Sequence, residues 1–110
     1  MTLQEVANVL KAAVHSGRDQ LDKPVLSGYA SDLLSEVMAH AQAGQLWFTV
    51  QTHLNVPAVA VLLDLGGIVI TGGNRPEPAV ITKGNENGMV IMTTPYTTFE
   101  AIALLCKAGF

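Results

Sequence analysis

The hydrophobic pattern of the chain alternates between helical spacing and short, continuously apolar runs. Near both ends of the chain, apolar residues recur every three or four positions. Each of these two segments follows a capping-box spacing, Thr2 with Glu5 and Thr97 with Glu100, and this predicts a helix at each end. We assign the apolar face of the last helix to four residues: Phe99, Ile102, Ala103 and Cys106.

Short apolar runs between these helices predict the strands of a sheet. Residues 46–50 combine aromatic and β-branched side chains, and residues 67–71 are almost entirely apolar before two glycines. Residues 89–92 form a third run of this kind. A shorter strand is expected near residues 12–15, and another is expected to begin at residues 25–26.

Helical patterns separate these strands, and the helices are expected to start at Ser31 or Asp32, at Asn55, and at Pro76 or Pro78. Continuously apolar strands that alternate with helices are typical of a parallel sheet covered on both faces. The sequence therefore predicts an α/β fold of three layers, with a mainly parallel sheet of about five strands and helices on both faces. Residues 1–110 are expected to form a single domain.

The composition excludes several classes of protein. Apolar residues make up 49% of the chain and charged residues 14%, against about 25% in an average protein, so a disordered chain is excluded. The net charge is −3 and the six basic residues are scattered along the chain, which argues against a nucleic-acid-binding protein. The apolar runs are shorter than the roughly 20 residues that a membrane-spanning helix needs, so we expect no membrane association.

The cysteine content and the start of the chain indicate a cytoplasmic protein. Cys106 is the only cysteine and has no partner for an internal disulfide, which fits a reducing compartment. No charged and then apolar leader opens the sequence, so we expect no secretory signal. Because Cys106 falls on the predicted apolar face of the last helix, we expect an inert thiol in the core.

The small number of charged and aromatic residues indicates an oligomer. A small domain with so little charge must place apolar area on its surface, and large exposed apolar patches usually mark partner surfaces. We therefore expect a homodimer with two-fold symmetry. The alternative is a compact monomer rich in alanine and glycine.

Polar side chains gather after the predicted strands. In open α/β sheets, ligands bind beyond the carboxyl ends of the strands, so these loops predict a site for a nucleotide or other small anionic ligand. The alternative is that the same residues only cap helices and form turns. The predicted ligand-binding residues are Ser31, Asp32, Gln51, His53, Asn55, Thr71, Gly72, Gly73, Arg75, Thr94, Tyr96 and Thr97.

An enzymatic role has less support in the sequence. Asp32 and His53 are the one plausible acid–base pair, and they define the alternative hypothesis of a small enzyme. The three histidines show no metal-ligand spacing, and neither GxxxxGK[ST] nor GxGxxG is present. We therefore expect no catalytic residues, no metal and no cofactor.

Three stretches in the second half of the chain carry a resemblance to a known family. They run over residues 68–78, 87–91 and 94–99, in the order strand, Thr-Gly-Gly, proline, helix, glycine, strand, Thr-Pro-Tyr-x-Thr-Phe. This set resembles the DRTGG domain, and Thr71-Gly72-Gly73 is the part of the name-giving string that is present. Residues 28–35 with 37–39, and residues 49–55 with 58–60, resemble the small stand-alone branch of that family, from which Pro57 departs.

The resemblance implies a three-layer α/β module with no defined chemistry of its own, often at a dimer interface. Family members occur between CBS domains in regulatory pyrophosphatases, and they are similar to the N-terminal domain of HPr kinase/phosphorylase. The stand-alone branch is similar to proteins found near hydrogenase components, which implies a protein partner in a metabolic or hydrogenase-associated system. The leading hypothesis is a non-enzymatic regulatory or protein-interaction module. A purely structural dimerisation unit is the third alternative.

Overall fold

A five-stranded sheet forms the middle layer of the structure, which is a computed structural model that describes residues 1–110. The spatial order of the strands is β1-β5-β4-β3-β2, in which β2 to β5 are parallel and β1 runs antiparallel to β5. The predicted mainly parallel sheet of five strands is thus confirmed. The strands are β1 (Ala13–Ser16), β2 (Gly28–Ala30), β3 (Leu46–Thr49), β4 (Gly67–Ile70) and β5 (Ile91–Thr93).

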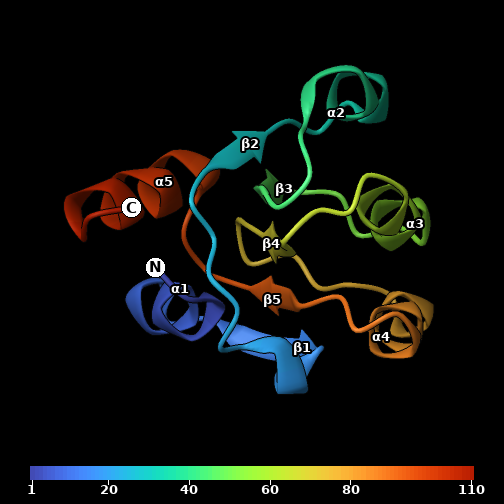
Figure 1. Cartoon of the computed structure of the whole chain (residues 1–110), viewed down its shortest axis with the longest axis horizontal. Coiled ribbons are helices and arrows are strands. Elements are labelled where there is room, and N and C mark those ends of the chain that lie inside the picture. Colours follow the sequence, from blue (N-terminus) through green and yellow to red (C-terminus); the bar gives the residue numbers. More distant parts are fainter.

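Helices cover both faces of this sheet, as predicted (Figure 1). On one face lie α1 (Leu3–Leu10) and α5 (Thr98–Lys107). On the other face lie α2 (Leu34–His40), α3 (Asn55–Leu62) and α4 (Pro78–Glu86). A single 3-10 turn, Arg18–Gln20, follows β1. No helix has the length and apolar character that a membrane crossing requires.

The core consists of two apolar clusters, one on each face of the sheet. Since successive strand residues point to opposite faces, Phe48 packs in the cluster under α1 and α5 while the neighbouring Trp47 packs in the cluster under α2 to α4. Val69 and Ile68 of β4 divide in the same way. This double burial explains why the central strands are continuously apolar in the sequence.

The two predicted capping boxes are both present. The Thr2 hydroxyl accepts a hydrogen bond from the Glu5 N–H, and the Glu5 carboxylate accepts one from the Thr2 N–H. Thr97 and Glu100 make the same exchange at the start of α5. Both helices therefore begin where the sequence predicts.

The predicted start of the second strand, at residues 25–26, is wrong: it lies three residues before the observed start at Gly28. The Val25 N–H donates to the Met1 carbonyl oxygen at 2.8 Å, and Pro24 forms an isolated bridge with Thr2, so this segment pairs with the N-terminus. The sheet strand β2 starts only at Gly28. The last strand is also displaced: the Met89 N–H bonds to the Gly84 carbonyl oxygen at the end of α4, and β5 begins at Ile91.

The predicted apolar face of α5 is wrong as well. Ala101 and Leu105 are its fully buried residues, whereas Phe99 is 83% exposed. Ala103 and Cys106 are exposed too, so Cys106 is not a core thiol. Residues 101–106 are all apolar, so periodicity alone fits more than one face, and contact with α1 and the sheet selects the face that carries Leu105.

This assignment predicts a contrast between two substitutions in one helix. We expect Leu105→Ala to lower the free energy of unfolding by about 2–5 kcal/mol, because it removes a fully buried side chain and leaves a cavity. Phe99→Ala should change it by less than about 0.5 kcal/mol, because that ring is largely in solvent. Urea unfolding of both variants measures the difference. Equal losses would contradict the observed orientation of α5.

Candidate functional site

The carboxyl ends of the four parallel strands meet at one edge of the sheet, and all twelve predicted ligand-binding residues lie in the loops and helix starts that follow them. Their side chains divide into separate groups. One group links the ends of β2 and β3, a second joins the loop after β4 to the loop after β5, and Arg75 stands apart from both. The first two groups are held largely by bonds within the protein.

Asp32 ties the end of β2 to the end of β3. Its Oδ1 accepts hydrogen bonds from the Thr49 hydroxyl at 2.9 Å and from the Val50 N–H at 2.8 Å. The Gln51 side-chain amide donates to the Asp32 carbonyl oxygen at 3.0 Å. The Asp32 carboxylate is therefore a strand-linking acceptor, and the prediction that it caps α2 is wrong.

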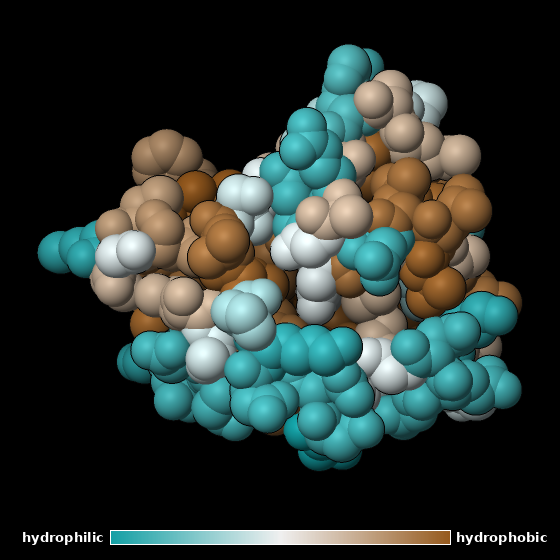
Figure 2. Space-filling model, viewed as in Figure 1, coloured by the Kyte–Doolittle hydropathy of each residue, from teal (hydrophilic) through white to brown (hydrophobic).

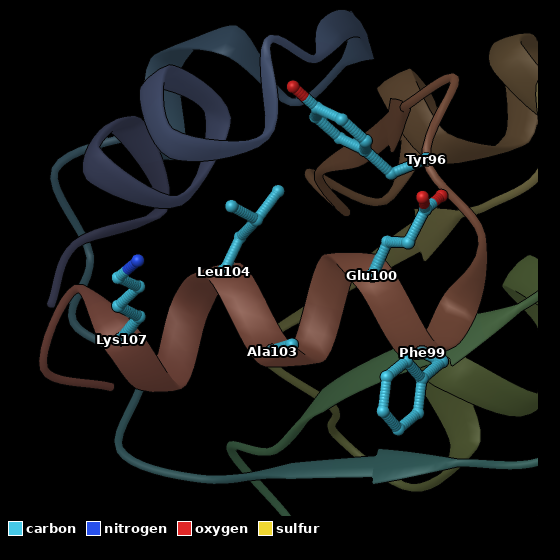
Figure 3. Close-up of a pocket in the computed structure, with 6 residues that line it drawn as sticks. All are labelled: Tyr96, Phe99, Glu100, Ala103, Leu104 and Lys107. Atoms are coloured by element: carbon cyan, nitrogen blue, oxygen red, sulfur yellow. The ribbon is translucent and has the colours of Figure 1, made fainter.

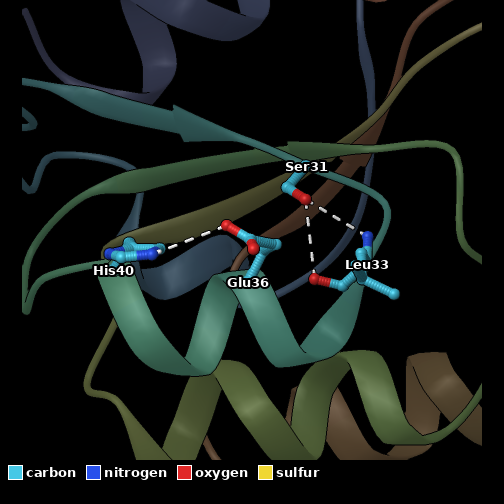
Figure 4. A network of polar contacts seen from close by, with 4 residues as sticks. All are labelled: Ser31, Leu33, Glu36 and His40. Atoms are coloured by element: carbon cyan, nitrogen blue, oxygen red, sulfur yellow. Dashed lines mark hydrogen bonds and ion pairs between the residues drawn. The ribbon is translucent and has the colours of Figure 1, made fainter.

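Ser31 does not cap α2 either, since the helix begins after Leu33 and has no side-chain cap. The Ser31 hydroxyl instead accepts from the Leu33 N–H at 3.2 Å in the turn before the helix (Figure 4). Further along α2, Glu36 and His40 lie one turn apart, with 3.6 Å between Oε2 of Glu36 and Nε2 of His40, and both side chains are exposed. Such an exposed pair contributes little to stability.

His53 and Asp32, the predicted acid–base pair, have different partners. The His53 Nδ1 lies 3.2 Å from Oε2 of Glu77, which precedes α4, and both side chains are exposed. Asn55 is the first residue of α3 rather than its cap, because the chain already turns at Leu54 and no side chain caps the helix. No group of three histidine, cysteine, aspartate or glutamate side chains is placed to hold a metal ion.

The Thr71-Gly72-Gly73 turn joins the loops after β4 and β5. Gly72 and Gly73 have φ values of 76° and 75°, which side chains rarely allow. In this conformation the Gly72 N–H donates to the Tyr96 carbonyl oxygen at 2.7 Å, and the Gly73 N–H donates to the Thr94 carbonyl oxygen at 3.0 Å. The turn therefore binds the second loop through its own backbone.

Buried hydroxyl groups reinforce this connection. The Thr71 hydroxyl lies 2.6 Å from that of Thr98, and the Thr94 hydroxyl donates to the Leu10 carbonyl oxygen at 2.7 Å. Thr71 and Thr94 are almost completely buried. Thr97 is occupied as the cap of α5. These hydrogen bonds account for the residue types at 71, 94 and 97, and a role in binding a ligand remains a prediction for them.

Arg75 differs because its side chain is exposed and lies beside a hollow of about 220 Å³. Sequence analysis did not associate Lys11 with this region, but Lys11 lines the same hollow, because the antiparallel β1 brings the end of α1 next to β5. The lining residues are Lys11, Ala13, Gly73, Asn74, Arg75, Thr93, Thr94 and Pro95.

His15 lies beside this region. Its Nε2 is 2.8 Å from the Thr93 hydroxyl. Burial disfavours the charged imidazolium and, together with the nearby positive charges of Arg18 and Arg75, lowers the pKa of His15 below its ordinary value of 6.5. The guanidinium groups of Arg18 and Arg75 thus disfavour a positive charge on His15 in β1, the strand next to the hollow.

Two other hollows have apolar linings and flank α5. The first, of about 390 Å³, lies between the edge strand β2 and α5 and includes Leu26, Phe48 and Phe110 in its lining. The second, of about 320 Å³, is lined by Tyr96, Phe99, Glu100, Ala103, Leu104 and Lys107 (Figure 3). Figure 3 shows Leu104 and Phe99 on different sides of the helix. The two charged residues of the second lining, Glu100 and Lys107, belong to α5 and not to the loops after the strands.

Comparisons with known proteins agree with this fold. The family model of the DRTGG domain matches residues 5–108. A crystal structure of the CBS and DRTGG domains of the regulatory region of Clostridium perfringens pyrophosphatase, complexed with the activator diadenosine tetraphosphate, superposes with a TM-score of 0.79 at 18% sequence identity. The similarity covers 94% of this chain but 45% of that one, so the present chain matches less than half of that regulatory region. No curated protein gives a significant sequence match.

The environment of His15 predicts a pH dependence of stability. Because its pKa is lower in the folded state, the unfolded chain takes up a proton first as the pH falls below 6.5. The free energy of unfolding should therefore decrease from about pH 6.5 down to the folded-state pKa. His15→Gln should remove this decrease, as measured by urea unfolding between pH 5 and 8.

His40→Gln is the matched control, because His40 lies exposed on α2, away from β1. This variant should retain the decrease. The carboxylate of Glu5 affects stability in a different pH range. Hydrogen bonds from Thr2 lower its pKa below 4.5, so its contribution to the free energy of unfolding is lost only as the pH falls below that value. A stability curve that His15→Gln leaves unchanged would contradict this account of His15.

Proposed function

Because the chain belongs to the DRTGG domain family, we propose that it is a non-enzymatic regulatory module that binds a nucleotide or another small anion at the carboxyl ends of its parallel strands. The observation that carries this proposal is the open hollow beside Arg75, next to the Thr-Gly-Gly turn. Ligands of open α/β sheets bind at this end of the strands. The structurally similar pyrophosphatase region is itself regulatory and is complexed with a nucleotide activator.

The polar contacts also favour binding over catalysis. The predicted acid–base pair is not assembled, because the Asp32 carboxylate is bonded to Thr49 and Val50 rather than to His53. His53 is paired with Glu77 in an exposed position. Most polar side chains at the carboxyl ends of the strands are hydrogen-bonded within the protein, and an open hollow lies beside them. This arrangement suits a site that binds a ligand without changing it chemically.

We also propose that the module is a cytoplasmic homodimer. Every residue of α3 after Asn55 is apolar, and a helix that is apolar all round is normally buried. Figure 2 shows an apolar surface over α3, with a mixture of polar and apolar atoms over α2. Five large exposed side chains on or beside these helices make up what we call the α2–α3 surface: Leu33, Met38, Leu54, Val61 and Leu62.

A ligand panel tests the regulatory proposal. Thermal unfolding of the protein should be measured with nucleotides, other phosphorylated metabolites and carboxylate anions such as citrate. A ligand that binds only the folded state raises its stability by about 2.7 kcal/mol at 100 times its dissociation constant, which shifts the melting temperature by several degrees in a domain of this size. A flat response across the panel would contradict the proposal.

Light scattering coupled to size exclusion tests the dimer. We expect the wild-type protein to elute as a dimer at micromolar concentration. Leu62→Glu should shift it to a monomer, because the side chain is 69% exposed and a buried, unpaired carboxylate at an interface is costly. Phe99→Glu, at a still more exposed position on the opposite face of the sheet, is the matched control and should leave the dimer intact. A monomeric wild-type protein would contradict the dimer.

A further inference from the structure

The hollow beside Arg75 concentrates positive charge that no carboxylate neutralises. Lys11 and Arg75 line it. The two ion pairs of the protein involve only histidines as the basic partner, so these two side chains have no carboxylate within 4.0 Å. In a chain with nine acidic and six basic residues, such a group attracts an anion.

Two backbone donors in the same loop are unoccupied. The N–H groups of Gly72 and Gly73 donate within the protein, but those of Asn74 and Arg75 donate to no protein acceptor. The Asn74 side chain is engaged, since its amide donates to the Thr71 carbonyl oxygen at 2.9 Å. A guanidinium, an ammonium and free backbone N–H groups are the donors that proteins use for phosphate.

Lys11 occupies a position where its backbone is unfavourable. It ends α1 with φ 50° and ψ 41°, a left-handed conformation that glycine adopts more easily. Its N–H donates to the carbonyl oxygens of Ala7 and Asn8, so this conformation caps α1. The cap places Lys11 in the lining of the hollow.

The size and lining of the hollow define which part of a ligand it can hold. Its volume of about 220 Å³ is below the roughly 300–1,000 Å³ of sites that enclose a whole drug-sized ligand. None of its lining residues is aromatic, so it has no aromatic ring on which a base could stack. The hollow therefore has donors for a phosphoryl group and no aromatic surface for a nucleobase.

We propose that this hollow binds the terminal phosphoryl group of a phosphorylated small molecule through Lys11, Arg75 and the free N–H groups of Asn74 and Arg75, without recognising the organic part. This inference rests on the proposed regulatory function and names the ligand class of that site. It also predicts that binding weakens as salt is added, because exposed charges are screened.

Titrations followed by amide resonances of the ¹⁵N-labelled protein test this inference. Pyrophosphate, ADP and GDP should each displace the resonances of Asn74 and Arg75, with dissociation constants within about threefold of one another, since the base makes no contact. Adenosine should displace neither. Lys11→Gln and Arg75→Gln should each weaken pyrophosphate binding about tenfold, as expected when one charge-assisted contact is lost.

Lys23→Gln is the matched control. It removes the same charge at the opposite end of the sheet, where Lys23 lies near Gly44 and Gly66, and should leave pyrophosphate binding unchanged. Wild-type affinity for pyrophosphate in the Lys11 and Arg75 variants, displacement of the two resonances by adenosine, or no displacement by millimolar pyrophosphate would each overturn the inference. If only citrate or another carboxylate stabilises the protein in the thermal panel, this inference fails and the regulatory proposal stands. If nothing does, the regulatory proposal fails too.

Discussion

The hydrogen bonds that Gly72 and Gly73 donate to the loop after β5 hold together the loops at the carboxyl ends of β4 and β5. Both glycines adopt positive φ, and the resulting turn satisfies the carbonyl groups of Tyr96 and Thr94. A Cβ on Gly72 would lie 3.2 Å from the Asn74 side chain, and at either position a side chain would strain the backbone. After this turn the chain is exposed at Asn74 and Arg75, whose N–H groups donate to no protein acceptor. The turn that bonds Gly72 and Gly73 to the loop after β5 thus also leaves the N–H groups of Asn74 and Arg75 without a protein acceptor.

The polar groups at this edge of the sheet are of two kinds: some are bonded within the protein, and others are exposed and can bind a ligand. The hydroxyls of Thr71 and Thr94 are buried and bonded, and the Asp32 carboxylate holds two strands together. Leaving such groups without partners inside the protein would cost free energy, so their bonds are required by the fold. Lys11 and Arg75, by contrast, are exposed, line the same hollow and have no carboxylate in ion-pair distance.

The sequence predicts the order of elements well because the strongest local signals agree with the tertiary structure. The capping boxes at Thr2 and Thr97 and the apolar run at residues 46–50 each correspond to an observed element. The errors occur where local patterns are ambiguous: α5 is apolar on several faces, and contact with α1 decides which is buried. Lys11 lies 64 positions from Arg75, and only the antiparallel pairing of β1 with β5 brings them to one hollow. No local pattern encodes that proximity.

The hollow and the α2–α3 surface are connected through the loop that links them. The Glu77 N–H donates to the Thr52 carbonyl oxygen at 3.3 Å, and the Glu77 carboxylate pairs with His53, two residues before α3. Glu77 follows Arg75 by two residues, so the loop that lines the hollow is bonded directly to the segment that starts the all-apolar helix. A ligand can alter association only by the difference between its affinities for the two states of the protein. The bond to Thr52 and the contact with His53 thus join the loop that carries Arg75 to the start of α3 at two points.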